Sequence, residues 1–529
     1  MHDIVLVGGG SAGCVLANRL SADGDRRVLL LEAGGPDTRP EIHIPAAFSR
    51  LFQSEADWNY HTEPQRHLDG RALYWPRGKV LGGSSSINAM IYIRGHHADY
   101  DGWAAAGCEG WGYANVLPYF KRSEDYAGGA GPYHGVGGEL RVEPPRSPSA
   151  FGEAFVEAAT RCGVQRNEDF NGPAQDGVGW YDLTQRGGRR ESAARAFLRP
   201  ALRRPNLDVE TGAHATRVVV EAGRAVGVEY VQGGETKVAR AGEVVVCGGA
   251  VNSPQLLMLS GIGPAEALGA LGIGVVADRP GVGENLQDHL IVGLRYRMPR
   301  GSLLDAEGPL SVLSYLAFRK GMLSSNIAEV GLFTHTRSGE AAPDVQFHVA
   351  PVLFEDHGLT PPTEHGFSIG PTGVRPRSRG QITLRSADPF EHPAIDPNYL
   401  ADPADLASLV EGLKVGREIA AEASLDAFRG EELSPGRGAA SDAELGAYVR
   451  STCETLYHPV GTCRMGADDD AVVDLELRVR GVDGLRVADA SVMPTVPNGN
   501  TNAPAMMIAE RAADLILGRP VGRVAAEAA

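Results

Sequence analysis

The sequence predicts an α/β fold, and three observations near the amino end support this prediction. Residues 4–7 form a short apolar run typical of a buried strand, and residues 14–20 follow with the apolar spacing of a helix. A second apolar run at residues 28–31 ends on Glu32. A strand, a helix and a strand in this order form a unit with parallel strands, so the chain is expected to open on a parallel sheet.

The turn between the first strand and the first helix has the spacing Gly8-x-Gly10-x-x-Gly13. This spacing is typical of dinucleotide binding: Gly8 allows the tight turn, Gly10 lets the backbone approach a pyrophosphate, and Gly13 lets the helix pack close to the strand. Glu32 is placed to accept a hydrogen bond from a ribose hydroxyl and disfavours a phosphorylated ribose. The spacing alone often marks an ordinary turn, but both strands, the helix and the acidic end accompany it here.

A second glycine-rich segment lies at residues 75–95. Gly82 and Gly83 are followed by three serines and then by apolar residues with a helical period. This pattern predicts a second set of backbone and hydroxyl donors at a helix start, suited to an anion. A capped helix after a flexible loop explains the same pattern.

The middle of the chain is expected to return to the first sheet. An amphipathic helix is predicted at residues 151–165, and a meander of strands leads to a buried parallel strand at residues 243–247. The earlier strands of the meander are predicted at residues 207–210, 217–222 and 225–231. A helix is then predicted to start on Ser253, with Pro254 at its first position.

The pattern of residues 290–450 differs from that of the first sheet and predicts a separate α+β unit. Its strands include residues 345–349 and 381–385, and its helices lie near residues 404–422 and 442–451. The tail contains a helical pattern from Met506 to Leu517, followed by a short flexible end after Gly518.

Composition excludes several classes of protein. The 529 residues include 50 basic and 66 acidic side chains, a net charge of −16, which argues against nucleic-acid binding. Six scattered cysteines without a Cys-x-x-Cys pair argue against a disulfide framework or a metal site. No apolar run approaches the ~20 residues of a membrane span, and no basic segment precedes the first strand. A cytoplasmic protein without an integral membrane segment is therefore expected.

Two late residues are candidates for catalysis. His458 precedes a proline, which holds it in an extended conformation, and Asn500 lies in a segment rich in asparagine and glycine. Taken singly, such a histidine is more often a satisfied core residue, and such an asparagine a turn residue.

Together, these segments resemble the glucose/methanol/choline (GMC) oxidoreductases, which are FAD-dependent enzymes that oxidise alcohols. The similarity spans nearly the whole chain and includes two long signatures in the expected order. The matching segments are residues 4–32, 78–101, 249–263, 280–289, 386–389 and 458–462. Among members of the family, the chain is most similar to the choline-dehydrogenase type.

The resemblance implies two interleaved domains. Residues 1–150, 200–290 and 452–529 would form a Rossmann-like FAD-binding domain. Residues 151–199 and 291–451 would form an α+β substrate-binding domain built on an antiparallel sheet. The alcohol is expected to bind over the flavin, beneath the second domain.

The resemblance also implies roles for individual residues. His458 matches the residue that takes the hydroxyl proton, and Asn500 matches the residue that orients the substrate oxygen. Glu329 and Tyr457 are candidates for substrate contact. The cofactor would contact Gly8, Gly10, Ser11, Ala12, Gly13, Glu32, Ala33, Val80, Gly83, Ser84, Asn88, Ala89, Val218, Asp489, Ala490, Asn500 and Thr501.

Two positions depart from some members of the family. Members that bind FAD covalently carry a histidine where this chain has Ile87, so the cofactor is expected to be non-covalent. Position 500 is Asn rather than His, which resembles choline-type and aliphatic-alcohol members more than glucose-type ones. Glu329 could meet a cationic headgroup or serve as a structural hydrogen-bond partner. The sequence shows no cluster of aromatic residues near these motifs that would form a cage for a trimethylammonium group.

Three functions remain open from the sequence. The first is oxidation of a primary alcohol, the second a non-redox reaction on the same scaffold by a lyase or photodecarboxylase, and the third structural binding of FAD without catalysis. The presence of both His458 and Asn500 favours oxidation over the decarboxylase. The sequence does not fix the alcohol, the oligomeric state, or whether oxygen, a quinone or a carrier protein reoxidises the flavin.

Overall fold

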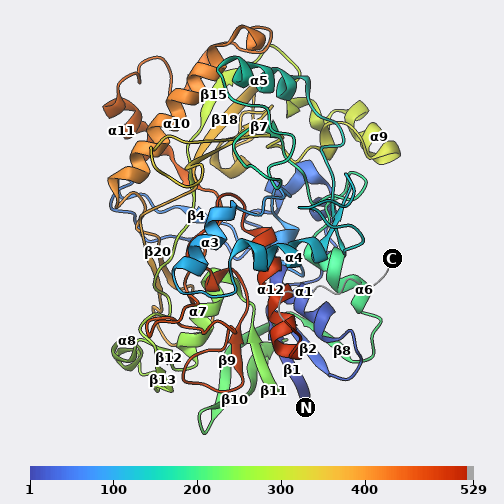
Figure 1. The fold of residues 1–529 in the computed structure, drawn as a ribbon, viewed down its shortest axis with the longest axis vertical. Coiled ribbons are helices and arrows are strands. Elements are labelled where there is room, and N and C mark those ends of the chain that lie inside the picture. The colour runs from blue at the N-terminus through green and yellow to red at the C-terminus, as the bar shows by residue number, and fades with distance from the viewer. Residues whose placement is uncertain (521–529) are drawn as a thin grey trace.

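Two β-sheets, one toward each end of an elongated molecule, organise the fold (Figure 1). The structure is a computed structural model that describes residues 1–520, so most of the predicted flexible end lies outside the described residues. None of the helices in residues 1–520 combines the length and apolarity needed to traverse a bilayer.

The first sheet contains the strands predicted near the amino end. Its order is β8-β2-β1-β11-β10-β9, and β23 pairs with β11. Strands β8, β2, β1, β11 and β23 run parallel to one another. On the other side, β9, β10 and the first part of β11 form an antiparallel meander, as predicted. The strands are β1 (His2–Val7), β2 (Val28–Glu32), β8 (Leu207–Thr211), β9 (Ala213–Glu221), β10 (Arg224–Gln232), β11 (Glu235–Val246) and β23 (Leu485–Val487).

The second sheet is antiparallel, as the resemblance implied, and has the order β21-β15-β18-β17-β16-β7; β14 also pairs with β18, and β22 pairs with β14. Helix α10 (Pro403–Ala421) packs on it closely. A Cβ at Gly416 would lie 2.6 Å from Leu294 Cδ1, so a larger residue here would force this leucine side chain to move. The strands are β7 (Gly177–Trp180), β14 (Leu290–Ile291), β15 (Leu294–Arg297), β16 (Val330–Thr334), β17 (Val345–Ala350), β18 (Gly366–Gly373), β21 (Glu432–Ser434) and β22 (Glu454–Thr455).

Shorter elements connect the two sheets. The described helices also include α1 (Ser11–Leu20), α2 (Pro40–His43), α3 (His97–Ala105), α4 (Tyr113–Ser123), α5 (Ala150–Arg161), α6 (Arg199–Ala201), α8 (Ala265–Ala270), α9 (Pro309–Phe318), α11 (Asp442–Thr452) and α12 (Asn502–Leu517). The small two-stranded sheets pair β3 (Tyr60–His61) with β4 (Tyr74–Trp75), β5 (Glu124–Tyr126) with β6 (Leu140–Val142), β12 (Ile262–Gly263) with β13 (Ala277–Asp278), and β19 (Gln381–Thr383) with β20 (Ala394–Asp396).

Helix α7 corrects one prediction. The sequence predicts a start on Ser253 with Pro254 first, but the helix spans Gly249–Leu259 and contains the proline. A proline inside a helix leaves the carbonyl four residues earlier without its usual donor. Here that carbonyl belongs to Ala250, and it accepts a hydrogen bond of 2.7 Å from the Thr462 hydroxyl. The helix therefore continues through the proline because a distant segment replaces the missing donor.

The second glycine-rich segment also differs from its prediction. Gly83–Ser86 form a single 3₁₀ turn, and no regular helix follows until α3. Gly82 and Gly83 have φ values of 91° and 52°, the left-handed region that glycine adopts readily. A Cβ on Gly83 would lie 2.7 Å from Gly10 Cα, so the two glycine-rich turns touch through their backbones.

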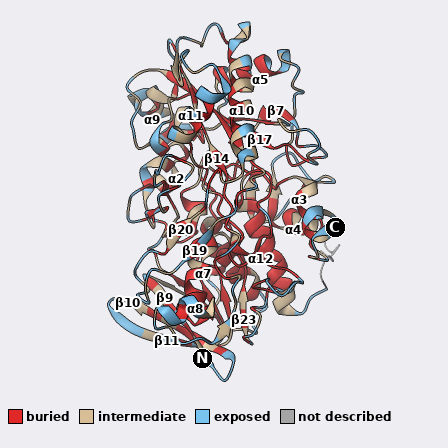
Figure 2. Cartoon of the chain, turned by 90° about the vertical axis from the view of Figure 1, so that its left-hand side faces the viewer, coloured by how far each residue is buried: buried red, intermediate tan, exposed pale blue. Residues whose placement is uncertain are grey.

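The last described helix packs against the first. The side chains of α12 are buried from Ala503 to Asp514 (Figure 2). Glu510 on α12 accepts hydrogen bonds from Arg19 of α1 at 2.8–3.1 Å. At the other end of the pair, Ser11 Oγ donates to Asn502 Oδ1 at 2.7 Å. The two ends of the described chain are therefore joined at the first sheet.

Candidate active site

A cavity of about 330 Å³ lies between the two sheets. One wall comes from the ends of β1 and β2 and from α1, and the opposite wall comes from β17 and β18. The cavity brings together most of the predicted cofactor contacts and both predicted catalytic residues. The predicted residues that line it are Gly8, Gly10, Ser11, Ala12, Glu32, Ala33, Gly83, Ser84, Asn88, Ala89, Tyr457, His458, Asp489, Ala490, Asn500 and Thr501.

The first glycine-rich turn opens toward the cavity. Gly8 has a φ of 104°, and a Cβ at this position would lie 2.5 Å from the Cys247 carbonyl oxygen. Helix α1 starts after Gly10 without a side-chain cap and without an acid in its first turn. Its first backbone N–H groups therefore face the cavity with the partial positive charge of a helix start, which suits a phosphate.

Gly13 contributes from outside the cavity. A Cβ here would lie 1.9 Å from the Gly8 carbonyl oxygen, so the glycine lets α1 pack against the turn. This is the packing role that the spacing predicts.

Glu32 ends β2 at the cavity and is buried. Its two carboxylate oxygens accept hydrogen bonds from the N–H groups of Gly9 and Gly34, each at 2.7 Å. Burial raises the pKa of Glu32 to about 7, although these two hydrogen bonds oppose the shift. The carboxylate is thus held rigidly at the place where a ribose hydroxyl is expected.

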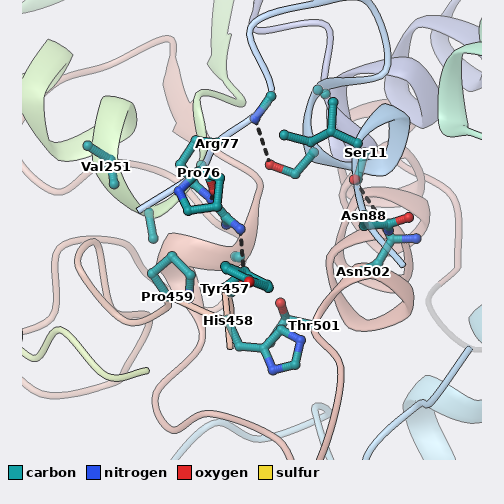
Figure 3. A pocket seen from close by; sticks show the side chains of 18 of the residues that line it. Ser11, Pro76, Arg77, Asn88, Val251, Tyr457, His458, Pro459, Thr501 and Asn502 are labelled. Carbon is teal, nitrogen blue, oxygen red and sulfur yellow. Dashed lines mark hydrogen bonds between the residues drawn. The ribbon is translucent and has the colours of Figure 1, made fainter. Parts of the chain in front are cut away.

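The carboxyl-terminal segment supplies further contacts to this end. Asp489 accepts hydrogen bonds from Gly249 N–H at 2.8 Å and from Ser253 Oγ at 2.6 Å, which fixes it beneath α7. Figure 3 shows Ser11 and Asn502 pointing toward each other on one side of the pocket. Residues distant in the sequence therefore build one continuous wall.

Besides Gly13, two predicted cofactor contacts do not line the cavity. Val218 lies buried on β9, and its N–H donates to Ser260 Oγ at 2.8 Å. The start of the same strand, residues 213–215, lines the cavity in its place. Val80 is buried among the apolar residues around Phe48 and accepts a hydrogen bond from Gly83 N–H through its carbonyl. Strand β9 and the glycine-rich turn at Gly83 therefore reach the cavity, but the side chains of Val218 and Val80 do not.

Glu329 is also absent from the cavity wall. Its carboxylate accepts hydrogen bonds from Ser325 Oγ at 2.7 Å and from the Ser149 N–H at 3.3 Å, and burial raises its pKa. Its position supports the structural alternative that the sequence left open.

The two predicted catalytic side chains face each other. His458 Nε2 lies 3.2 Å from Asn500 Nδ2. Asn500 Oδ1 lies 3.5 Å from Gln346 Nε2, which directs the amide N–H groups of Asn500 toward the imidazole. Asn500 therefore donates to Nε2, and the proton of the neutral His458 ring belongs on Nδ1.

The sequence did not predict that His289 and Asp288 contact His458. Nδ1 of His289 lies 3.0 Å from Nδ1 of His458, and the backbone N–H of His458 donates to Asp288 at 2.7 Å. Both residues close the segment 280–289 that carries the family resemblance. That segment is the only signal in the sequence, because 169 residues separate the two histidines.

Electrostatics keep this imidazole neutral. The pKa of His458 lies well below its ordinary 6.5, first because the ring is buried and then because His289, His348 and Arg77 lie near it. Burial also lowers the pKa values of His289 and His348 to about 3. A neutral Nε2 can accept a proton, which a general base requires.

The second part of the cavity is mainly apolar, and its aromatic side chains correct one expectation. Ring centroids of Phe48 lie 5.8 Å from Phe52 and 6.3 Å from Phe354, and Phe52 lies 5.7 Å from Tyr457. All four residues line the cavity. The sequence separates Phe48 from Tyr457 by most of the chain, so the cluster could not be seen before folding.

Tyr457 joins this cluster to a polar group at the same wall. Its hydroxyl lies 2.6 Å from His357 Nδ1, and its carbonyl accepts a hydrogen bond from Arg77 at 2.6 Å. Figure 3 shows Arg77 reaching Tyr457 beside His458. The possible ligand atoms of Asp356, His357 and Glu454 lie within 4.8 Å of one another, and His357 Nδ1 lies 3.8 Å from Glu454 Oε2.

Fold and site together define a protein that holds a dinucleotide beside a buried imidazole and amide. Comparison with known proteins places it more closely. The family model for GMC oxidoreductases matches residues 2–291 and 376–509. The chain therefore belongs to the GMC oxidoreductase family.

Individual relatives agree with this placement. The chain is 48% identical to "Alcohol dehydrogenase [acceptor]" of Pseudomonas putida, over 98% of this chain and 96% of the relative. It is 47% identical to the mitochondrial choline dehydrogenase of Homo sapiens, over 98% and 90%. The crystal structure of pyridoxine 4-oxidase from Mesorbium loti superposes with a TM-score of 0.91 at 36% identity, covering 98% and 99% of the two chains. At the level of the family, these matches confirm the predicted fold class, the flavin cofactor and the oxidoreductase class.

Proposed function

We propose that this chain is an FAD-dependent enzyme that oxidises a primary alcohol to an aldehyde. The residues present fit the cofactor: the free N–H groups of α1 and the touching glycine-rich turns suit a pyrophosphate, and Glu32 suits a ribose. Ile87 lines the cavity and offers no nucleophile, which supports non-covalent binding.

The protein's own residues account for the proton. When bound, FAD supplies a two-electron acceptor for the hydride of the carbinol carbon. His458 Nε2 accepts the hydroxyl proton, and its lowered pKa keeps it available near neutral pH. Asn500 orients the substrate oxygen through its amide without competing for the proton.

One observation carries this proposal: a neutral imidazole nitrogen and an amide lie 3.2 Å apart in the cavity that also contains the nucleotide-binding turn. The aromatic cluster Phe48, Phe52, Phe354 and Tyr457 favours an alcohol with an apolar substituent or a cation that contacts ring faces.

The non-redox alternative has less support, because the relatives above are named as dehydrogenases and an oxidase. Binding of FAD without turnover is likewise disfavoured, because His458 and Asn500 are both in place beside the nucleotide end.

Two further predictions belong to this proposal. The first domain would comprise residues 1–150, 200–290 and 452–529, and the second residues 151–199 and 291–451. The two sheets support this division except at two strands of the second sheet: β14 (Leu290–Ile291) crosses the boundary, and β22 (Glu454–Thr455) belongs to the first domain. A cytoplasmic location is supported by six free cysteines, five of them buried.

Anaerobic flavin bleaching tests the function. A panel of primary alcohols should bleach the flavin absorbance of the purified protein, about 10²-fold faster than in His458→Ala. The partly buried His365, which pairs with Ser302, provides the control variant His365→Ala, and its rate should equal that of the wild type. A flavin-loaded protein that no alcohol bleaches, or an unchanged rate in His458→Ala, would contradict the proposal.

A further inference from the structure

Helix α9 (Pro309–Phe318) carries an unusual concentration of exposed apolar side chains. Leu310, Leu313, Leu316 and Phe318 are 84%, 62%, 62% and 68% exposed, whereas only Tyr315 is buried. The helix lies at the edge of the molecule, and no described element covers its outer face (Figure 1). Apolar residues exposed singly are ordinary, but a contiguous patch on one helix marks an interaction surface.

A basic cluster borders the carboxyl end of this helix. Arg319 and Lys320 follow the helix directly, while Arg146 and Arg189 approach from two other segments. These segments are joined, because Gly321 N–H donates to Ser147 Oγ at 2.9 Å and Tyr315 OH donates to the Gly188 carbonyl at 3.1 Å. None of these four cations has an ion-pair partner within residues 1–520.

The acidic groups near the other end of α9 are largely engaged. Glu307 pairs with Arg50, and Asp305 lies 4.0 Å from His365. Unpaired positive charge thus gathers beside the apolar face, in a protein whose net charge is −16. An apolar helix face next to unpaired cations is complementary to an anionic lipid surface, which offers acyl chains and negative headgroups together.

We propose that α9 and the basic cluster dock this protein on the surface of an anionic lipid bilayer, with the helix lying in the plane of the headgroups. Ten residues span about 15 Å, half of the hydrocarbon core, so the helix can enter the interface but not cross it. The patch is also small for a second copy of the chain: one face of about 15 by 10 Å offers roughly 150 Å², against about 800 Å² per partner in a stable dimer.

The surface is connected to the candidate active site. Helix α9 packs on the 3₁₀ turn Met322–Ser324, which packs on the 3₁₀ turn Pro45–Leu51. The second turn carries Phe48, which lines the cavity. Docking through α9 would therefore place the aromatic end of the cavity near the lipid surface.

Vesicle flotation of the intact, flavin-loaded protein tests this proposal. Vesicles of phosphatidylcholine with about 30% phosphatidylglycerol should bind the wild-type protein about tenfold or more tightly than vesicles of phosphatidylcholine alone, and high salt should weaken the binding. Leu313→Glu with Leu316→Glu should lower binding at least tenfold. Arg319→Glu with Lys320→Glu should remove the preference for anionic vesicles.

Leu202→Glu provides the matched control, because Leu202 is 50% exposed and lies away from α9, after α6. Its binding should equal that of the wild type, and flavin content and melting temperature should show that every variant folds. Absence of binding by the wild type, or unchanged binding by the α9 variant, would overturn the proposal. A wild-type dimer that Leu313→Glu converts to a monomer, without loss of vesicle binding, would identify the face as a self-interface instead.

Discussion

The Nδ1 atoms of His289 and His458 lie 3.0 Å apart, so the candidate base is held from behind by a second imidazole. His289→Ala should lower the rate of flavin reduction by alcohol about tenfold, because His458 loses the acceptor that fixes its tautomer. It should also raise the pKa of the acid limb, since His289 helps to lower the pKa of His458. Stopped-flow reduction across a pH series measures both effects.

His289→Asn is the matched variant for that experiment. The asparagine side-chain oxygen can accept the Nδ1 proton, so this variant should recover most of the rate. Equal losses in the alanine and asparagine variants would assign His289 to packing alone.

The pH profile of the reaction follows from the lowered pKa of His458. A base with a pKa well below 6.5 stays unprotonated until the solution is more acidic, so kcat/KM should remain on its plateau through pH 6.5 and fall only below it. Initial rates with one alcohol over a range of pH values measure the limb. A limb centred at or above pH 6.5 would show that His458 does not have the pKa that its burial implies.

The buried His348 should make stability depend on pH. Its pKa falls from 6.5 to about 3 on folding, so it binds a proton only in the unfolded state between these values. Its contribution is complete above pH 6.5 and is lost as the pH falls, at about 1.4 kcal/mol per pH unit. Denaturant unfolding at several pH values measures how the free energy of unfolding changes with pH. Between about pH 4 and 6.5 this change per pH unit should be smaller in His348→Asn than in the wild type by this amount. The same pH dependence in both proteins would show that His348 does not have the lowered pKa.

Glu32 should govern the affinity for FAD. Glu32→Ala removes the acceptor for both Gly9 and Gly34 and should weaken flavin binding by about tenfold or more, whereas Glu32→Gln keeps one acceptor and should lie between. Titration of the apoprotein with FAD measures the dissociation constants. Glu266→Gln on α8 is the exposed control and should bind FAD as tightly as the wild type. If Glu32→Ala bound FAD as tightly as Glu266→Gln, Glu32 would not govern the affinity for FAD.

The cofactor should leave the protein without bond cleavage. Ile87 stands where covalent members have a nucleophile, so acid precipitation should release the yellow colour into the supernatant. Colour that stays with the precipitate would require another attachment residue.

Local patterns predicted those features that neighbouring residues determine. The first βαβ unit, Glu32 at the end of β2, and helices α10 and α11 all appear within three residues of their predicted positions. The hydrophobic period and the glycine spacing specify these elements without help from the rest of the chain.

Tertiary contacts decided the features that the sequence did not reveal. Pro254 suggested a helix start, but the Thr462 hydroxyl lets α7 continue through it. The His289–His458 pair and the aromatic cluster joining Phe48 to Tyr457 link segments far apart in the sequence. Hydrophobic periodicity does not predict contacts between residues that are far apart in the sequence. Only the resemblance to a family indicated which segments form the active site.

The contact between the first and the last described helix has a consequence for synthesis of the protein. Asn502 and Glu510 of α12 reach Ser11 and Arg19, and Asn500 and Thr501 complete the cavity. Asn502 follows Ser11 by 491 residues, so the wall beside the glycine-rich turn can close only after this much of the chain has been translated. We therefore expect flavin to load only after α12 has formed, and a chain that stops before Asn500 to be colourless.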